Sequence, residues 1–246
     1  METLKGKIAL ITGGNSGIGY ATAKELKLQG AEVIITGRRE DALQKAAADL
    51  GVAGFVSDQG RVSAIEELAE KVRAQYGRID ILFINAGVLA GAGIENATER
   101  DLDYVMDVNF KGAYFTLSRF IPILNDGASV VFLSSNVASM SGANSSIYSS
   151  SKTALNSIMK IAAVELAPRG IRVNAVSPGP TQTEILNKLG LDQASRQGLD
   201  DWMIERIPLR KIGAADDVAK MVAYFAGEAS GFITGTEIVM DGGMSL

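Results

Sequence analysis

One tyrosine and one lysine, Tyr148 and Lys152, stand four residues apart in the serine-rich stretch SIYSSSK. At this spacing in a helix their side chains share one face. A phenol has an ordinary pKa of about 10, so Tyr148 would hold a proton at neutral pH and could donate it to a reacting group. A nearby ammonium group would favour the tyrosinate and lower the pKa of Tyr148, so that it could also accept a proton. The pair could therefore move protons without an imidazole.

The composition excludes the commoner catalytic groups. The 246 residues contain no histidine and no cysteine, which excludes a Ser-His-Asp triad, thiolate catalysis, disulfides and imidazole or thiolate metal sites, and we predict no bound metal. The formal net charge is -4, and no basic run offers a surface for nucleic acid or for a membrane. Neither a secretory signal nor a membrane span is visible, so we expect a cytoplasmic protein.

Short apolar runs alternate with longer amphipathic ones along the whole chain. The short runs are almost continuously apolar, which is typical of a parallel sheet covered on both faces. The alternation predicts an α/β fold: one domain over 1–246 with a Rossmann-like, doubly wound parallel sheet of about seven strands in the order 3-2-1-4-5-6-7 and helices on both faces. The strands are expected at 7–12, 31–36, 53–57, 79–85, 128–134, 171–177 and 236–241.

The segment 183–212 interrupts this alternation, because it lacks a strand pattern and places apolar residues among charges. Two short helices that form a lid over the substrate are one interpretation. The alternative is that these apolar residues simply pack down on the core.

A glycine-rich turn, TGGNSGIG, spans Thr12 to Gly19 directly after the first predicted strand. Glycines let a backbone approach a phosphate closely, and the N-terminus of the following helix offers free N–H groups and a positive dipole end. The spacing, Gly13-x3-Gly17-x-Gly19, differs from G-x-G-x-x-G, so an ordinary tight turn is the alternative. The position after the first strand favours a dinucleotide site.

The second predicted strand ends in TGRRE, with Arg38 and Arg39. NAD sites usually place an acidic residue about 20 positions beyond the glycines, where it binds the ribose hydroxyls. Two guanidinium groups stand there instead, and arginine suits the 2′-phosphate of NADP. We therefore favour NADP(H) and keep NAD(H) as the alternative. The remaining interpretation is that Arg38 and Arg39 are solvent-exposed residues without a binding role.

Six sequence motifs then follow one another in a recognisable order. They are TGGNSGIG, NAG at 85–87, Asn109 in DVNFKG, Ser135 in FLSSN, YSSSK at 148–152 and VSPGPTQT at 176–183. Together they resemble the short-chain dehydrogenase/reductase family, from about residue 5 to the DGG at 241–243. The resemblance implies hydride transfer between a nicotinamide dinucleotide and a carbonyl compound. It also implies a homotetramer, to which the apolar run 153–166 could contribute a contact, although core burial would also explain that run.

The resemblance implies a role for each matching residue. Tyr148 would be the general acid and base, Lys152 would also bind the nicotinamide ribose, and Ser135, chosen over Ser134 by its spacing from the tyrosine, would hydrogen-bond the substrate oxygen. Asn109 would hold a water that links Lys152 to solvent. The cofactor would contact Gly13, Asn15, Ser16, Ile18 and Gly19 at its pyrophosphate and ribose, Arg38 and Arg39 at the 2′-phosphate, Asp58 and Gln59 at the adenine, Asn85, Ala86 and Gly87 along its length, and Pro178, Gly179, Thr181 and Thr183 at the nicotinamide. Because Asn15 and Ser16 are neutral where many NADP-using relatives carry a base, Arg38 bears the cofactor preference.

Substrate selection should lie in 88–95, 137–146 and 183–212, which are rich in small and aliphatic residues and favour a neutral, moderately apolar ketone or aldehyde. A 3-oxoacyl group on a carrier protein is the alternative, since basic residues in the third segment could form a positively charged patch. Acidic residues in the same segment would weaken the charge of that patch. An alternative of another class is a regulator that senses a dinucleotide without catalysis. The presence of all four predicted catalytic residues argues against it, because a sensor does not need them. The candidate substrate contacts are Val137, Ser145, Leu186 and Trp202, and the basic residues are Lys188, Arg206, Arg210 and Lys211.

Overall fold

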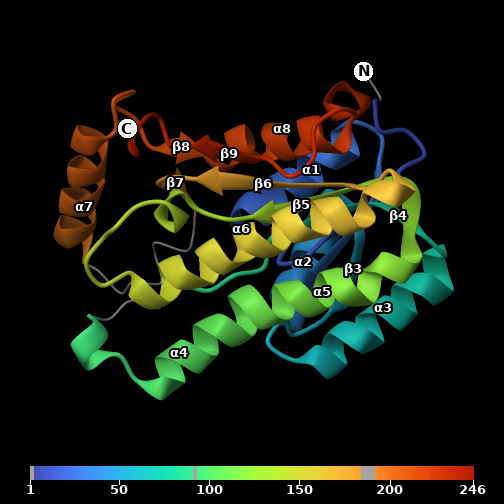
Figure 1. The fold of residues 1–246 in the computed structure, drawn as a ribbon, viewed down its shortest axis with the longest axis horizontal. Coiled ribbons are helices and arrows are strands. Elements are labelled where there is room, and N and C mark those ends of the chain that lie inside the picture. The colour runs from blue at the N-terminus through green and yellow to red at the C-terminus, as the bar shows by residue number, and fades with distance from the viewer. Residues whose placement is uncertain (1–2, 91–92, 184–191) are drawn as a thin grey trace.

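The computed structural model describes residues 3–90, 93–183 and 192–246. Seven strands form one parallel sheet in the order β3-β2-β1-β4-β5-β6-β9 (Figure 1), so the predicted fold class and strand order are confirmed. The order reverses between β1 and β4, where doubly wound sheets bind ligands at the carboxyl ends of their strands. The strands are β1 Ile8–Ile11, β2 Glu32–Gly37, β3 Ala53–Val56, β4 Ile79–Ile84, β5 Leu124–Leu133, β6 Arg172–Pro178 and β9 Glu237–Met240.

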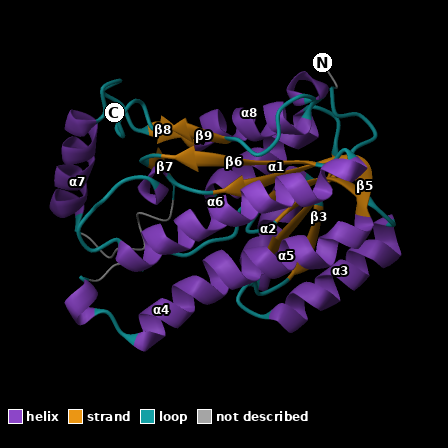
Figure 2. Cartoon of the chain, viewed as in Figure 1, coloured by secondary structure: helices purple, strands orange, loops and turns teal. Residues whose placement is uncertain are grey.

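Helices cover both faces of the sheet (Figure 2). One face packs against α1 Gly17–Leu28, α2 Glu40–Leu50 and α8 Ala215–Ala226. The other face packs against α3 Val62–Tyr76, α5 Ala113–Phe120 and α6 Ser146–Leu166. A shorter helix, α4 Glu99–Met106, runs into α5 through the π-helix Asp107–Gly112. None of the helices in the described ranges is both long and apolar enough to cross a membrane.

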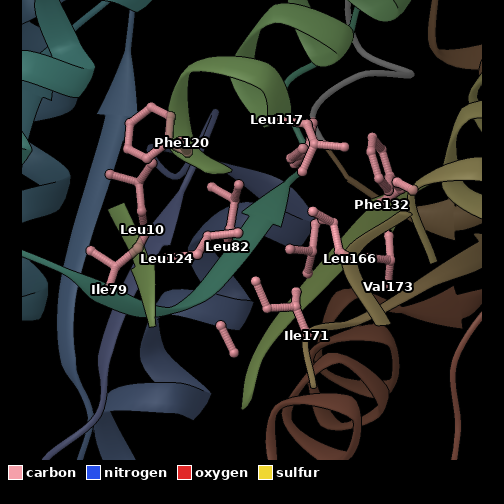
Figure 3. Packing of buried hydrophobic residues seen from close by; sticks show 14 of the residues in the cluster. Leu10, Ile79, Leu82, Leu117, Phe120, Leu124, Phe132, Leu166, Ile171 and Val173 are labelled. Carbon is pink, nitrogen blue, oxygen red and sulfur yellow. The ribbon is translucent and has the colours of Figure 1, made fainter. Parts of the chain in front are cut away.

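The two faces of the sheet carry separate apolar cores, which explains the continuous apolar runs in the sequence. Consecutive strand residues point to opposite faces, so Leu82 joins the core under α3, α5 and α6 while its neighbour Phe83 joins the other. In the first core, Phe120 from α5 and Phe132 from β5 are completely buried (Figure 3). Burying a side chain of this size stabilises the fold by about 1.5–3 kcal/mol.

Strand β5 begins at Leu124, earlier than the predicted start at 128. The polar sequence around Asn125 reads as a turn, yet it joins the sheet because the register between β4 and β5 shifts after Ile79. Asn125 Nδ2 donates a hydrogen bond of 3.0 Å to Asp80 Oδ1, which fixes this irregular end of the strand.

The insert at 183–212 is bracketed by a second, two-stranded sheet. Strand β7, Thr181–Gln182, pairs in parallel with β8, Gly213–Ala214. Between them lies one helix, α7 Gln193–Arg206, whereas 184–191, including Leu186 and Lys188, lies outside the described residues. Met203 and Ile207 are buried, so part of the insert does pack on the core.

Candidate active site

The residues predicted to carry chemistry follow the carboxyl ends of neighbouring strands. Gly13 follows β1, Asn85 follows β4, Ser135 follows β5, and Pro178 is the last residue of β6. Because parallel strands end at one edge of the sheet, segments far apart in the sequence meet there. Helix α6 then brings the face that carries Tyr148 towards this edge, since the side chain of Ser135 hydrogen-bonds Tyr148.

The glycine turn has a backbone that side chains would obstruct. Gly13 and Gly17 adopt positive φ angles of 66° and 55°, which L side chains rarely adopt. A Cβ atom on Gly19 would lie 2.3 Å from the carbonyl oxygen of Gly13. Ser16 is the N-cap residue of α1, but its hydroxyl makes no capping hydrogen bond. Among the residues that the structure describes, the turn therefore offers a helix N-terminus without a side-chain cap, which fits a phosphate group.

Thr12 and Asn85 clamp this turn to β4. Thr12 Oγ1 accepts hydrogen bonds of 3.0 Å from the backbone N–H groups of Asn85 and Ala86. Asn85 Nδ2 donates to the carbonyl oxygens of Thr12, at 2.8 Å, and Gly13, at 3.0 Å. Both amide hydrogens of Asn85 are thus used within the chain, and Ile18 packs against the core below. The Nδ2 group of Asn85 and the side chain of Ile18 therefore shape the site.

Two exposed arginines, Arg38 and Arg39, follow β2 beside the glycine turn. The side chain of Asn15 lies against Gly37, where an added Cβ would be 2.8 Å from Asn15 Oδ1. No ion pair within the described parts of the chain involves either arginine. Their charges are therefore available to an anion, as the 2′-phosphate prediction requires.

The two residues predicted to contact an adenine differ in orientation. Gln59 is buried, and its Nε2 donates a hydrogen bond of 2.6 Å to Thr116 Oγ1 in α5. Its amide is therefore directed into the protein, which does not support the predicted contact. Asp58 is half-buried and accepts a hydrogen bond of 3.0 Å from the N–H of Gly60. Asp58 alone remains as the candidate at that end of the site.

Ser135, rather than Ser134, faces Tyr148. Ser134 Oγ is buried and donates to the carbonyl oxygen of Lys152 at 3.4 Å. Ser135 Oγ accepts from the N–H of Val137 at 3.4 Å and donates to the carbonyl oxygen of Pro178 at 3.5 Å, and its interaction with Tyr148 lowers the pKa of that phenol. This geometry favours Ser135, the serine that its spacing from the tyrosine had suggested, and its catalytic role stays a prediction.

Tyr148 and Lys152 have pKa values shifted in opposite directions. Lys152 is 3% exposed, and burial lowers its pKa to about 8. Burial raises the pKa of Tyr148 to about 12, and the hydrogen bond with Ser135 opposes this rise only in part. The prediction that Lys152 lowers the pKa of Tyr148 is not confirmed here, since desolvation of the phenol outweighs other effects. Lys152 Nζ donates a 2.7 Å hydrogen bond to the carbonyl oxygen of Leu133.

Asn109 lies in the π-helix and joins three elements. Its Oδ1 accepts from the N–H of Val88 at 2.8 Å, and its Nδ2 donates to the Val88 carbonyl oxygen at 2.9 Å and to Ser151 Oγ at 3.2 Å. A Cβ on Gly87 would lie 3.3 Å from Asn109 Oδ1 and 3.6 Å from Lys152 Nζ. Gly87 thus keeps the space between these two polar groups open, and the water at Asn109 stays a prediction.

The turn after β6 reaches back to the glycine turn. Gly179 N donates to the carbonyl oxygen of Met240 at 3.0 Å, and the buried Thr181 donates through Oγ1 to the carbonyl oxygen of Gly179 at 2.9 Å. A Cβ on Gly17 would lie 3.4 Å from Thr183 Cβ. The segment predicted to bind the pyrophosphate and the segment predicted to bind the nicotinamide therefore lie next to each other.

Sequence reasoning missed two buried polar residues at this edge, Asn136 and Asp241. Asn136 directly follows Ser135, and Asp241 directly follows β9; they are 5% and 9% exposed. Asn136 Nδ2 lies 3.4 Å from Asp241 Oδ2. The DGG at 241–243 was the available signal, but nothing in the sequence pairs it with a residue 105 positions earlier.

A groove of about 800 Å³ runs along α6, and two of the predicted substrate residues, Val137 and Ser145, line it. At 100° per residue, Ser150 and Ser157 in its wall are rotated about 200° and 180° from Tyr148. The part of the groove that α6 forms therefore lies on the side away from Tyr148. Trp202 is not in the groove; it is 48% exposed and stacks under Arg206, whose guanidinium carbon is 4.3 Å from the ring centroid.

Comparisons with known proteins agree with this arrangement over nearly the whole chain. A family model described as enoyl-(acyl carrier protein) reductase matches residues 13–245. The 3-oxoacyl-[acyl-carrier-protein] reductase FabG of Thermotoga maritima is 37% identical, covering 98% of this chain and 98% of its own. A short-chain dehydrogenase/reductase from Serratia marcescens superposes with a TM-score of 0.92 at 31% identity, covering 99% and 100%. A short-chain dehydrogenase from Burkholderia cenocepacia, solved in complex with NADP, gives 0.90 at 32% identity with the same coverage.

Proposed function

This chain belongs to the short-chain dehydrogenase/reductase family of oxidoreductases, and we propose that it interconverts a ketone or aldehyde and an alcohol with NADP(H). The observation that carries the proposal is the meeting of Ser135, Tyr148 and Lys152 beside Gly87, at the carboxyl edge of the sheet. A protein that only sensed a dinucleotide would have no use for a phenol, a serine hydroxyl and an ammonium group gathered there.

A nicotinamide dinucleotide, when bound, supplies or accepts the hydride. Tyr148 keeps its proton at neutral pH, as a phenol ordinarily does, and burial raises its pKa further, to about 12. It therefore donates that proton to the carbonyl oxygen during reduction. Ser135 Oγ orients the same oxygen and stabilises its developing charge. In alcohol oxidation Tyr148 must first lose its proton, and the ammonium group of Lys152, 5.7 Å from the ring centroid, favours the anion.

The preference for NADP(H) over NAD(H) rests on Arg38. Its exposed guanidinium follows β2 beside the glycine turn, where the 2′-phosphate of a bound NADP would lie. The NADP complex of the Burkholderia cenocepacia protein supports the same choice. The pyrophosphate is assigned to Gly13, Ser16 and Gly19.

A second candidate substrate is a 3-oxoacyl group on a carrier protein, which the Thermotoga maritima relative favours. An acidic carrier needs a basic surface near the site. Arg206, Arg210 and Lys211 are exposed at the end of the insert, although Arg206 stacks on Trp202 and Arg210 donates to the carbonyl oxygen of Glu205. Comparing kcat/KM for a small ketone with that for a carrier-bound 3-oxoacyl thioester decides between the two.

The assembly is assigned as a homotetramer. Ile161 and Val164 on α6 are 55% and 76% exposed, and Phe232 and Val239 near the last strand are exposed on another part of the chain. Large apolar side chains at two separate places suit two different contacts between copies. Sedimentation equilibrium tests this: a monomer at micromolar concentration contradicts it.

NADPH oxidation with a panel of neutral ketones, aldehydes and 3-oxoacyl thioesters tests the proposed activity. Tyr148→Phe should lower turnover by about 10²–10⁴-fold while dinucleotide binding is retained. Tyr224→Phe, which removes the hydroxyl of an exposed tyrosine that donates to the carbonyl oxygen of Ala229, is the matched control and should be fully active. Dinucleotide binding without turnover of any carbonyl compound would favour the regulator instead.

A further inference from the structure

The carboxylate of Asp241 accepts hydrogen bonds from three donors at the end of β9. Oδ1 accepts from the N–H of Gly243 at 2.9 Å, and Oδ2 accepts from the N–H of Ser245 at 2.9 Å and from Asn136 Nδ2 at 3.4 Å. Burial alone would raise its pKa, but hydrogen bonds from Ser245, Gly243 and Asn136 hold the pKa of Asp241 below its ordinary value. The group is therefore an anion at neutral pH, in a setting that suits only an acceptor.

The turn after β6 packs closely against the Cα and Cβ atoms of Asp241 and lies near the side chain of Asn136. A Cβ added to Gly179 would lie 2.5 Å from Asp241 Cβ and 3.3 Å from Asn136 Nδ2. The preceding residue, Pro178, accepts the 3.5 Å hydrogen bond from Ser135 Oγ. Two adjacent contacts thus join the serine segment to the turn: Ser135 meets Pro178, and Asn136 with Asp241 meets Gly179.

We propose that Asp241, acting through Asn136, is a positioning residue that fixes Ser135 and the Pro178–Gly179 turn relative to each other. Asn136 is the next residue after Ser135, so an anchored Asn136 side chain limits rotation of the backbone that aims the serine hydroxyl at Tyr148. The same hydrogen bond holds together the two residues against which Gly179 packs. This inference rests on the function proposed above, because it assigns a role in that reaction.

Two single variants test this positioning role. Asp241→Asn places an amide donor among groups that are themselves donors, and Asn136→Ala removes the link to Ser135. We expect either change to lower kcat by about 10–100-fold, the size of effect that a misplaced catalytic group produces. The dissociation constant for NADPH should change much less. Because the Ser135 hydrogen bond lowers the pKa of Tyr148, the pH profile of alcohol oxidation should also move to higher pH.

A double variant and a structural control separate positioning from loss of stability. Asp241→Asn with Asn136→Asp restores one donor and one acceptor between the two positions and should recover part of the lost kcat. Asn174→Ala removes another buried amide from β6, one that binds the backbone of Ile233 and Thr236 instead. That variant should lower the unfolding free energy yet leave the pH profile where it is.

The outcomes separate this inference from the proposed function. Unchanged kcat and pH profile in Asn136→Ala, with Tyr148→Phe still inactive, overturn the positioning role and leave the function standing. If Asp241→Asn does not fold, Asn136→Ala alone decides. No turnover by the unaltered protein with any carbonyl compound overturns the proposed function and this inference together.

Discussion

The ammonium nitrogen of Lys152 lies 5.7 Å from the centroid of the Tyr148 ring, on the same face of α6. Lys152 is buried and Tyr148 is half-buried, and burial disfavours the charged form of each, which lowers the pKa of Lys152 to about 8 and raises that of Tyr148 to about 12. At neutral pH the pair is therefore a protonated phenol beside a mostly protonated amine. That protonation state suits the proposed carbonyl reduction, whereas alcohol oxidation would first require Tyr148 to lose its proton.

The buried amine should make folding stability depend on pH. The pKa of Lys152 is about 8 in the folded protein and 10.5 in its ordinary state, so between these values the unfolded chain binds more protons and stability rises with pH. Lys152→Met should remove this rise. We expect the difference in unfolding free energy between the two proteins to change by on the order of 2 kcal/mol from pH 7 to pH 9.5. Urea unfolding without cofactor measures it, and parallel curves for the two proteins would contradict the assigned shift.

Alcohol oxidation should become faster as the pH rises. The reaction needs tyrosinate, and below the pKa of Tyr148 the tyrosinate fraction grows about tenfold per pH unit. From pH 6 to 7.5, where Lys152 stays mostly charged, log kcat/KM for the alcohol should rise with a slope of about 1, whereas ketone reduction should stay nearly constant. Ser135→Ala removes the hydrogen bond that lowers this pKa and should reduce oxidation at every pH in this range. A flat oxidation profile in the unaltered protein would show that Tyr148 is not the base.

The sheet could be predicted from sequence because each strand is buried on both faces. Leu82 and Phe83 are neighbours that enter different cores, so a continuous apolar run is the direct consequence of the fold. The pairing of Tyr148 with Lys152 was equally predictable, because both lie on one helix at a spacing of four. Local periodicity was sufficient wherever both partners belong to a single element.

Other features depend on contacts between distant segments and could not be predicted. Gln59 turns inward because Thr116 on α5 offers it an acceptor, and the sequence does not place that helix beside residue 59. The direction of the Tyr148 pKa shift depends on how much water the fold removes, which the number of residues between Tyr148 and Lys152 does not reveal. Asp241 and Asn136 meet only because β9 lies next to β6 and β6 next to β5.

Cofactor preference should change when the charge at Arg38 is reversed. Arg38→Asp replaces a cation that suits a 2′-phosphate with an anion that repels it, and lost hydrogen bonds to charged groups cost about 1.5–3 kcal/mol, or about 10–100-fold. The KM for NADPH should rise by this factor while the KM for NADH changes little. Arg39→Asp is the matched control, one residue along, and should have a smaller effect. Equal changes in both KM values for Arg38→Asp would remove the phosphate assignment.

Gly112→Ala should destabilise the junction between the π-helix and the loop after β3. A Cβ at Gly112 would lie 2.1 Å from the carbonyl oxygen of Gln59 and 3.1 Å from that of Asp107. Both are backbone atoms, so relief requires moving a main-chain segment, at a cost of about 3 kcal/mol. Gly198→Ala in α7 is the control, because a Cβ there meets open space and should stabilise the helix by about 0.5–1 kcal/mol. Urea unfolding compares the two, and equal stability of both variants would mean that the close approach at Gly112 does not exist in solution.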